Sequence, residues 1–183
     1  PDGAFNFGGI LAPDYTSIQV HKGPLSSLYG SDAITGVIHQ TLAKGTNAPY
    51  VSLTTEHGTF DTHKTSLTTL GTCGRAHYHL FGSALRTQGF VTTPLAYRTN
   101  TRQFLTDASS LATLQGRFDA DLSQDTTLTF HTNTNTQRSD YPMAFTPQNP
   151  FWTGRSQSQQ LLTTLTNEKL WGDHLLIKHK LLF

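Results

Sequence analysis

Nine histidines and one cysteine are the side chains in this sequence that could bind a transition metal or a haem. His77 and His79 would lie on the same side of a strand, because alternate residues of a strand point to the same face. A zinc site takes at least three protein ligands, however, and the spacing places no third ligand beside these two. We therefore expect no metal site and no bound cofactor, and interpret the histidines as polar packing residues.

Motifs of known catalytic sites are missing from the sequence. It contains no Gly-x-Ser-x-Gly elbow, no His-Glu-x-x-His pair and no phosphate-binding loop. Cys73 is next to Gly74 in a predicted turn, where an incidental thiol is a simpler interpretation than a nucleophile. As the sole cysteine it can form neither an internal disulfide nor a redox pair. The sequence therefore predicts a protein that is not an enzyme.

Three charged residues share the polar side of one predicted strand. From Ala112 to Ser123, apolar or small residues alternate with polar ones without a break, which is the pattern of a strand with one polar and one apolar face. We predict that the polar side faces the lumen of a barrel, where its charges can pair with each other or with a segment inside the lumen. The alternative is a solvated sheet face. The predicted lumen-facing residues are Arg117, Asp119 and Asp121.

Aromatic and basic residues in two long predicted loops are the candidates for contact with a ligand. Aromatic rings stack on flat organic groups, and Arg binds carboxylates or oxygen-rich chelates. Simple loop packing or an aromatic girdle at a membrane surface is the alternative interpretation. The candidates are Tyr97, Arg98, Tyr141, Phe145, Phe151, Trp152 and Arg155.

About seven strands must position these groups. Several reach about ten residues, which is the length that crosses a bilayer at a tilt, whereas strands of soluble sheets usually have about five or six. Tight turns alternate with long connections near residues 89–109 and 137–157, as in outer-membrane barrels. A soluble β-sandwich also shows alternation and remains the other reading. The expected strands are residues 51–57, 63–70, 75–86, 112–123, 126–136, 159–168 and 174–183.

Composition narrows the classes of partner. Charged residues make up 14% of the 183 residues and the formal net charge is +1, so there is no sustained basic field for nucleic acid. No apolar run is long enough for a membrane-spanning helix, but a spanning strand needs an apolar residue only at every second position. The sequence begins at Pro1 without a secretion signal, so we interpret it as a fragment of a longer protein.

The segment from Ser17 to Gly45 reads SIQVHKGPLSSLYGSDAITGVIHQTLAKG. It resembles the closing stretch of the plug domain of TonB-dependent outer-membrane receptors, in which a strand leads through an Arg-Gly-Pro turn and a short helix ending in Tyr-Gly to a final strand. Gln19, Lys22, Thr35 and His39 depart from the usual Glu, Arg, Gly and Asn. The positions that carry the plug motif are Lys22, Gly23, Pro24, Tyr29, Gly30, Asp32 and Gly36.

The resemblance implies an all-β fragment of a transmembrane antiparallel β-barrel, preceded by the end of a small α+β plug domain. Residues 1–45 would be the C-terminal part of the plug, and residues 46–183 the first strands of an incomplete barrel. The implied function is uptake of a scarce, bulky nutrient, such as a ferric siderophore or cobalamin, across the outer membrane of a Gram-negative bacterium. The implied partners are outer-membrane lipid, the metal-chelate or corrinoid ligand, and the TonB complex through an N-terminal segment outside this sequence. A non-transporting β-rich surface adhesin or carbohydrate-binding module is the alternative.

Overall fold

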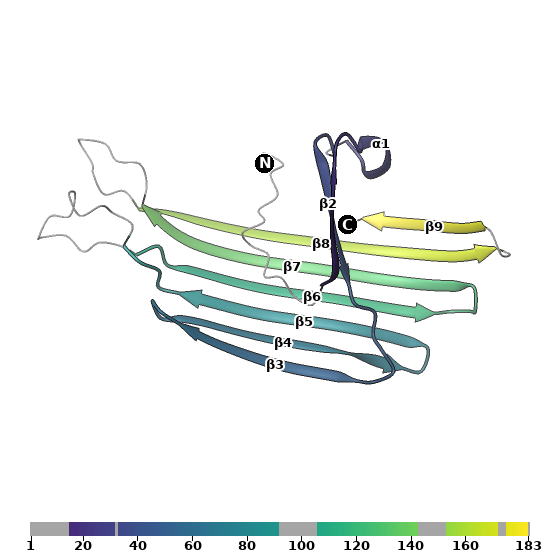
Figure 1. The fold of residues 1–183 in the computed structure, drawn as a ribbon, viewed down its shortest axis with the longest axis horizontal. Coiled ribbons are helices and arrows are strands. Elements are labelled where there is room, and N and C mark those ends of the chain that lie inside the picture. The colour runs from purple at the N-terminus through teal and green to yellow at the C-terminus, as the bar shows by residue number, and fades with distance from the viewer. Residues whose placement is uncertain (1–14, 32, 92–105, 143–152, 172–174, 183) are drawn as a thin grey trace, which may run out of the picture.

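The computed structural model describes residues 15–31, 33–91, 106–142, 153–171 and 175–182. The described chain is almost entirely β-structure, arranged as two antiparallel sheets (Figure 1). The small sheet contains β1 (Tyr15–Lys22) and β2 (Gly36–Leu42), with a one-turn helix α1 (Ser26–Tyr29) between them. The large sheet contains β3 (Tyr50–Gly58), β4 (Thr62–Cys73), β5 (Ala76–Thr87), β6 (Ser109–Asp121), β7 (Thr126–Pro142), β8 (Thr153–Trp171) and β9 (Leu175–Leu182).

The large sheet is a simple meander in which every strand pairs with its neighbours in sequence, from β3 to β9. Figure 1 shows long, gently curved strands lying side by side. Within the described residues β3 and β9 are the two edges of this sheet. The strands from β4 to β8 have 12 to 19 residues, which is well beyond the usual length of soluble strands.

Tight turns connect several of these strands. Phe60 and Asp61 both have positive φ between β3 and β4, and Gly74 has φ +61° between β4 and β5. Between β6 and β7, the amide of Leu122 donates to the carbonyl of Thr126 over 2.9 Å. The β4–β5 and β6–β7 turns lie at one end of the sheet, which we call the turn end. The opposite end, where β5 ends, β6 begins and the β3–β4 turn lies, is called the loop end (Figure 1).

The prediction of an all-β antiparallel fold is confirmed, and each of the seven expected strands is present. The predicted loop over residues 137–157 was too long, because the β7–β8 ladder continues to the pair Pro142–Thr153. Likewise β4 continues to Cys73, three residues beyond the expected end at residue 70, so Cys73 ends a strand and does not lie in a turn. Whether the sheet belongs to a barrel remains a prediction.

The β1–β2 hairpin runs across the strands of the large sheet on one of its faces (Figure 1). Gly36 is required at the start of β2, since a Cβ there would lie 2.6 Å from the carbonyl oxygen of His21. In the described part of the chain α1 is the only helix, and with four residues it is far too short to cross a membrane.

The two faces of the large sheet differ in which side chains are buried. In β6 the face that carries Gln115 and Asp119 is covered, with these side chains only 1% and 2% exposed. The opposite face carries Leu114 and Phe118, which are 58% and 42% exposed. We call these the polar face and the apolar face. The ladders extend both faces across the neighbouring strands, because residues paired across strands point to the same side.

Candidate functional site

The candidate site is the contact between the hairpin and the polar face, near the turn end. Its centre is the guanidinium of Arg117, which donates to both carboxylate oxygens of Asp119 at 2.8 and 3.1 Å. Another nitrogen of the same group donates to the carbonyl oxygen of Leu42, the last residue of β2, at 2.8 Å. A planar fork of this kind fixes direction as well as distance. Arg117 therefore ties the end of the hairpin to β6.

Asp119 is held on its other side by β7. The hydroxyl of Thr129 donates to the Asp119 carboxylate at 2.7 Å. A carboxylate with this little exposure is stable in the folded chain only if its charge is paired and its oxygens accept hydrogen bonds. Arg117 and Thr129 supply both, so the contact is a built polar cluster rather than a solvated surface pair.

A second group of contacts lies one step closer to the turn end. The carboxylate of Asp121 lies 3.7 Å from the ammonium of Lys44 and accepts a hydrogen bond from Thr127 at 2.9 Å. The ring of His77 bridges the same carboxylate and the carbonyl oxygen of Gly45, both at 3.1 Å. Lys44 and Gly45, which follow the hairpin in sequence, are therefore held by β5 through His77 and by β6 through Asp121.

Gly45 is buried against the backbone of the sheet. A Cβ at this position would lie 2.7 and 2.8 Å from the carbonyl oxygen and amide nitrogen of Tyr78, and it would overlap the carbonyl oxygen of Gly71. No side chain fits there without a backbone shift. The absence of a side chain is what allows the connection to leave the polar face and enter β3.

A cavity of about 760 Å³ lies between the hairpin and the polar face farther along the sheet. The amide oxygens of Asn133 and Asn135 are buried there without a hydrogen-bond partner among the described residues. Such oxygens favour water or a ligand that donates hydrogen bonds. The lining residues come from both sheets and include Val37, His39, Gln40, His131, Gln159, Leu162 and Lys180.

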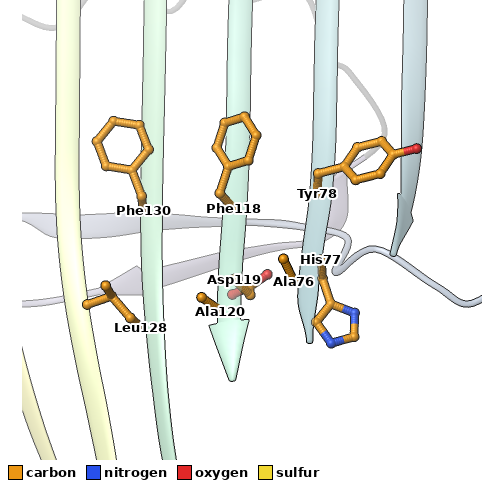
Figure 2. Close-up of a pocket in the computed structure, with 8 residues that line it drawn as sticks. All are labelled: Ala76, His77, Tyr78, Phe118, Asp119, Ala120, Leu128 and Phe130. Atoms are coloured by element: carbon orange, nitrogen blue, oxygen red, sulfur yellow. The ribbon is translucent and has the colours of Figure 1, made fainter. Parts of the chain in front are cut away.

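The apolar face carries an aromatic cluster near the turn end (Figure 2). The rings of Phe118 and Phe130 lie side by side on β6 and β7, with centroids 6.3 Å apart. Tyr78 on β5 extends over Gly71 of β4, where a Cβ would lie 2.7 Å from its hydroxyl oxygen. The pocket beside these rings is lined mainly by apolar atoms. His77 and Asp119 also belong to its lining, but they are paired residues of the polar face.

The β3–β4 turn contains a further polar cluster at the loop end. Asp61 accepts hydrogen bonds from the ring of His63 and the side-chain amide of Gln88, both at 2.8 Å. These two bonds, the one from His63 first, hold the pKa of the Asp61 carboxyl below its ordinary value. The other ring nitrogen of His63 lies 2.8 Å from His57, its partner across the strands.

Most of the residues predicted to contact a ligand fall outside the described residues: Tyr97, Arg98, Phe145, Phe151 and Trp152. The backbone of Tyr141 belongs to β7. Arg155 is exposed on β8 and pairs with Asp140 on β7 at 2.7 and 3.4 Å. The proposed ligand group therefore remains a prediction.

The plug-motif residues lie around the tip of the small sheet. Lys22, Pro24 and Tyr29 are exposed, and Asp32 lies outside the described residues. Gly23 and Gly30 have φ of +112° and +99°, a conformation that glycine adopts without strain. The motif glycines thus have a structural reason to be glycine whatever the function is.

The sequence placed Arg117, Asp119 and Asp121 on one face, and the structure puts all three on the polar face against the hairpin. It gave no indication of Lys44, Gly45 or the carbonyl of Leu42 as their partners. A backbone carbonyl has no residue signature, and the contact from Leu42 to Arg117 spans 75 positions. Within the described residues, no group of three or more His, Cys, Asp or Glu side chains is arranged to hold a metal ion.

Comparisons with protein-family models and with curated protein sequences found no match.

Proposed function

We propose that this chain is part of a TonB-dependent receptor in the outer membrane of a Gram-negative bacterium. Residues 46–183 are then the first strands of the barrel wall, and residues 1–45 are the end of the plug. The observation that carries this proposal is the reversed burial of the large sheet. Its covered side chains include Gln115, Asp119 and Asn135, whereas Leu53, Leu67 and Leu114 are exposed on the opposite face. A hydrocarbon environment makes that arrangement favourable, and water does not.

The height of the apolar face also supports a hydrocarbon environment on that side of the sheet. On β6, ten residues separate Ala120, at the turn end, from Ser110, at the loop end. Ten residues of antiparallel strand span about 34 Å, which a tilt of about 40° reduces to about 25 Å along the membrane normal. This is about the height of the apolar band on outer-membrane barrels. Between these rows, the apolar faces of β5, β6 and β7 carry no charged side chain.

The position of the hairpin supports its assignment as plug. It lies on the polar face, which would be the lumen side, and it carries the motif that resembles the closing stretch of the plug. Arg117 donates a charge-assisted hydrogen bond to the carbonyl oxygen of Leu42, and Asp121 pairs with Lys44, so the end of the hairpin is held against the wall. A plug must be held in this way when it blocks the lumen and must remain attached when part of it moves.

The function follows from this architecture without covalent chemistry. A scarce nutrient too large for simple diffusion, such as a ferric siderophore or cobalamin, binds at the loop end. The TonB complex acts on the N-terminal part of the plug and displaces it, which opens a path along the polar face. This is a displacement switch, in which the Arg117 and Asp121 contacts keep the end of the plug attached to the wall.

Uptake by whole cells tests the proposal. The complete protein is expressed in a bacterial strain without its own receptors, and entry of labelled ferric siderophores and cobalamin is measured with and without TonB. We expect entry of at least one of these ligands, abolished when TonB is deleted. Surface binding of sugars or host proteins, with no TonB-dependent entry of any of these nutrients, would contradict the proposal and favour an adhesin.

A further inference from the structure

A row of polar and basic side chains crosses the apolar face at its loop end. The strand registers align His63 with Arg86, Arg86 with Ser110, and Ser110 with Arg138. The same row continues to His57 on β3 and to Gln157 on β8. All six residues are exposed and lie on the side of the sheet that carries Leu67 and Leu114. The row therefore forms a border where the apolar surface ends.

Two permanent positive charges stand close together in this border. Arg86 and Arg138 flank Ser110 on neighbouring strands, so their Cα atoms are separated by two strand spacings, about 10 Å. Neither guanidinium forms an ion pair with the described residues. Long side chains at this separation can converge on one anion, with the Ser110 hydroxyl between them as a further donor.

The acidic groups near the border are engaged elsewhere. The Asp140 carboxylate binds Arg155 at 2.7 Å, one row farther toward the loop end, and the charge of Arg138 also contributes to the lowered pKa of this carboxyl. The Asp61 carboxylate accepts bonds from His63 and Gln88, and it also lies close enough to Arg86 for that charge to contribute to its lowered pKa. The arginines therefore keep most of their donors available to an external anion.

We propose that the pair Arg86 and Arg138, with Ser110 between them, binds the phosphate groups of lipid headgroups in the leaflet that surrounds the loop end. The inference rests on the proposed membrane position of the sheet. About 25 Å above the turn-end row, these side chains lie where the hydrocarbon ends and phosphates begin. Arg binds phosphate through a planar fork, and each basic residue near an anionic membrane surface strengthens the interaction about fivefold. The border would anchor the wall at a fixed depth.

Refolding of the complete protein into vesicles tests this assignment. The wild-type protein and the double variant Arg86→Gln/Arg138→Gln are unfolded with urea in vesicles of phosphatidylcholine alone and of phosphatidylcholine mixed with phosphatidylglycerol. Lys22→Gln is the matched control, because it removes one positive charge from the exposed tip of the hairpin, which lies on the polar face and away from lipid in the proposed arrangement. A further sample contains phosphatidylcholine vesicles with inorganic phosphate in the buffer.

Relative to the double variant, we expect phosphatidylglycerol to raise the folding equilibrium constant of the wild type by about fivefold for each arginine. Lys22→Gln should respond to phosphatidylglycerol as the wild type does. An equal response of the double variant and the wild type would overturn the assignment. So would an equal gain from inorganic phosphate alone. If the wild type enters neither kind of vesicle, the proposed function fails, and this inference fails with it.

Discussion

The two faces of the large sheet are built from the same strands but have opposite surroundings. The polar face is covered by the β1–β2 hairpin and keeps its charges paired, as in the Arg117–Asp119 fork. The apolar face is uncovered and displays leucines and aromatic rings. Burial in the large sheet therefore does not follow hydrophobicity. In our account the apolar side is covered by lipid, and the polar side by the plug.

The largest effect is expected when the polar face loses its buried charge. Asp119→Ala leaves Arg117 without its carboxylate partner in a covered position, and breaking such a buried pair costs roughly 3 to 5 kcal/mol of unfolding free energy. Urea titration of the complete protein in lipid measures it. Asp125→Ala, in the exposed β6–β7 turn, is the control and should change stability little. Equal stability of both variants would mean that the polar face is solvated.

An arginine introduced on the apolar face should cost more unfolding free energy than one introduced on the polar face. Leu161 and Leu162 are neighbours on β8, both are exposed, and they point to the apolar and polar faces respectively. Leu161 lies in the row of Leu114, near the middle of the apolar band, so Leu161→Arg should cost about 2 to 4 kcal/mol. Leu162→Arg, facing the polar cavity, should cost less than about 1 kcal/mol. Equal costs in the same titration would remove the distinction between the faces.

The attachment of the hairpin is tested at Gly45. Gly45→Ala should cost roughly 1 to 3 kcal/mol, because the added Cβ meets backbone atoms of β4 and β5 that can move only together with the sheet. Faster proteolysis between the hairpin and β3 should accompany the loss. Gly58→Ala is the matched control, since its Cβ would make only an ordinary contact of 3.5 Å with Thr62. If both variants resisted proteolysis equally, the close approach at Gly45 would not matter.

The smallest effect is expected at the loop end, outside both faces. The pKa of Asp61 is lowered from its ordinary 3.8 by the bonds from His63 and Gln88. A lowered pKa means that the carboxylate contributes its full stabilisation above pH 3.8 and loses it as the pH falls through the lowered value. Hydrogen exchange of the β3–β4 turn should therefore rise over that window. In Asp61→Asn the rise should be absent, and its persistence would assign the titration to another group.

The sequence predicted the strands and their facing well where side chains alternate. In β6 the alternation from Ala112 to Ser123 indicated which residues are covered together, including Arg117 and Asp119. It failed for the ends of β7 and β8, where Arg138, Ser139 and Asp140 are all polar. There the strands are continued by backbone pairing, which leaves no mark in the pattern of side chains.

For each polar contact at the hairpin, the sequence predicted the residue on the large sheet but not its partner. Charges on one strand face were evident, but their partners are a backbone carbonyl at Leu42 and residues in a connection, Lys44 and Gly45. The same limit applies to Gly45, where the resemblance put the boundary between two regions but did not indicate a close approach to Tyr78. Contacts of this kind depend on how two sheets cross, and local sequence carries no information about that angle.

Lipid contact at the two neighbouring leucines of β8 shows directly whether the apolar face of the sheet lies against the membrane. In a Cys73→Ser background, a single cysteine replaces Leu161 or Leu162 in the complete protein, and each carries a small fluorophore in vesicles. We expect brominated acyl chains to quench the label at position 161 and not at 162, and aqueous iodide to reach position 162 more easily. Efficient iodide quenching at both positions, with no effect of brominated lipid at 161, would contradict it.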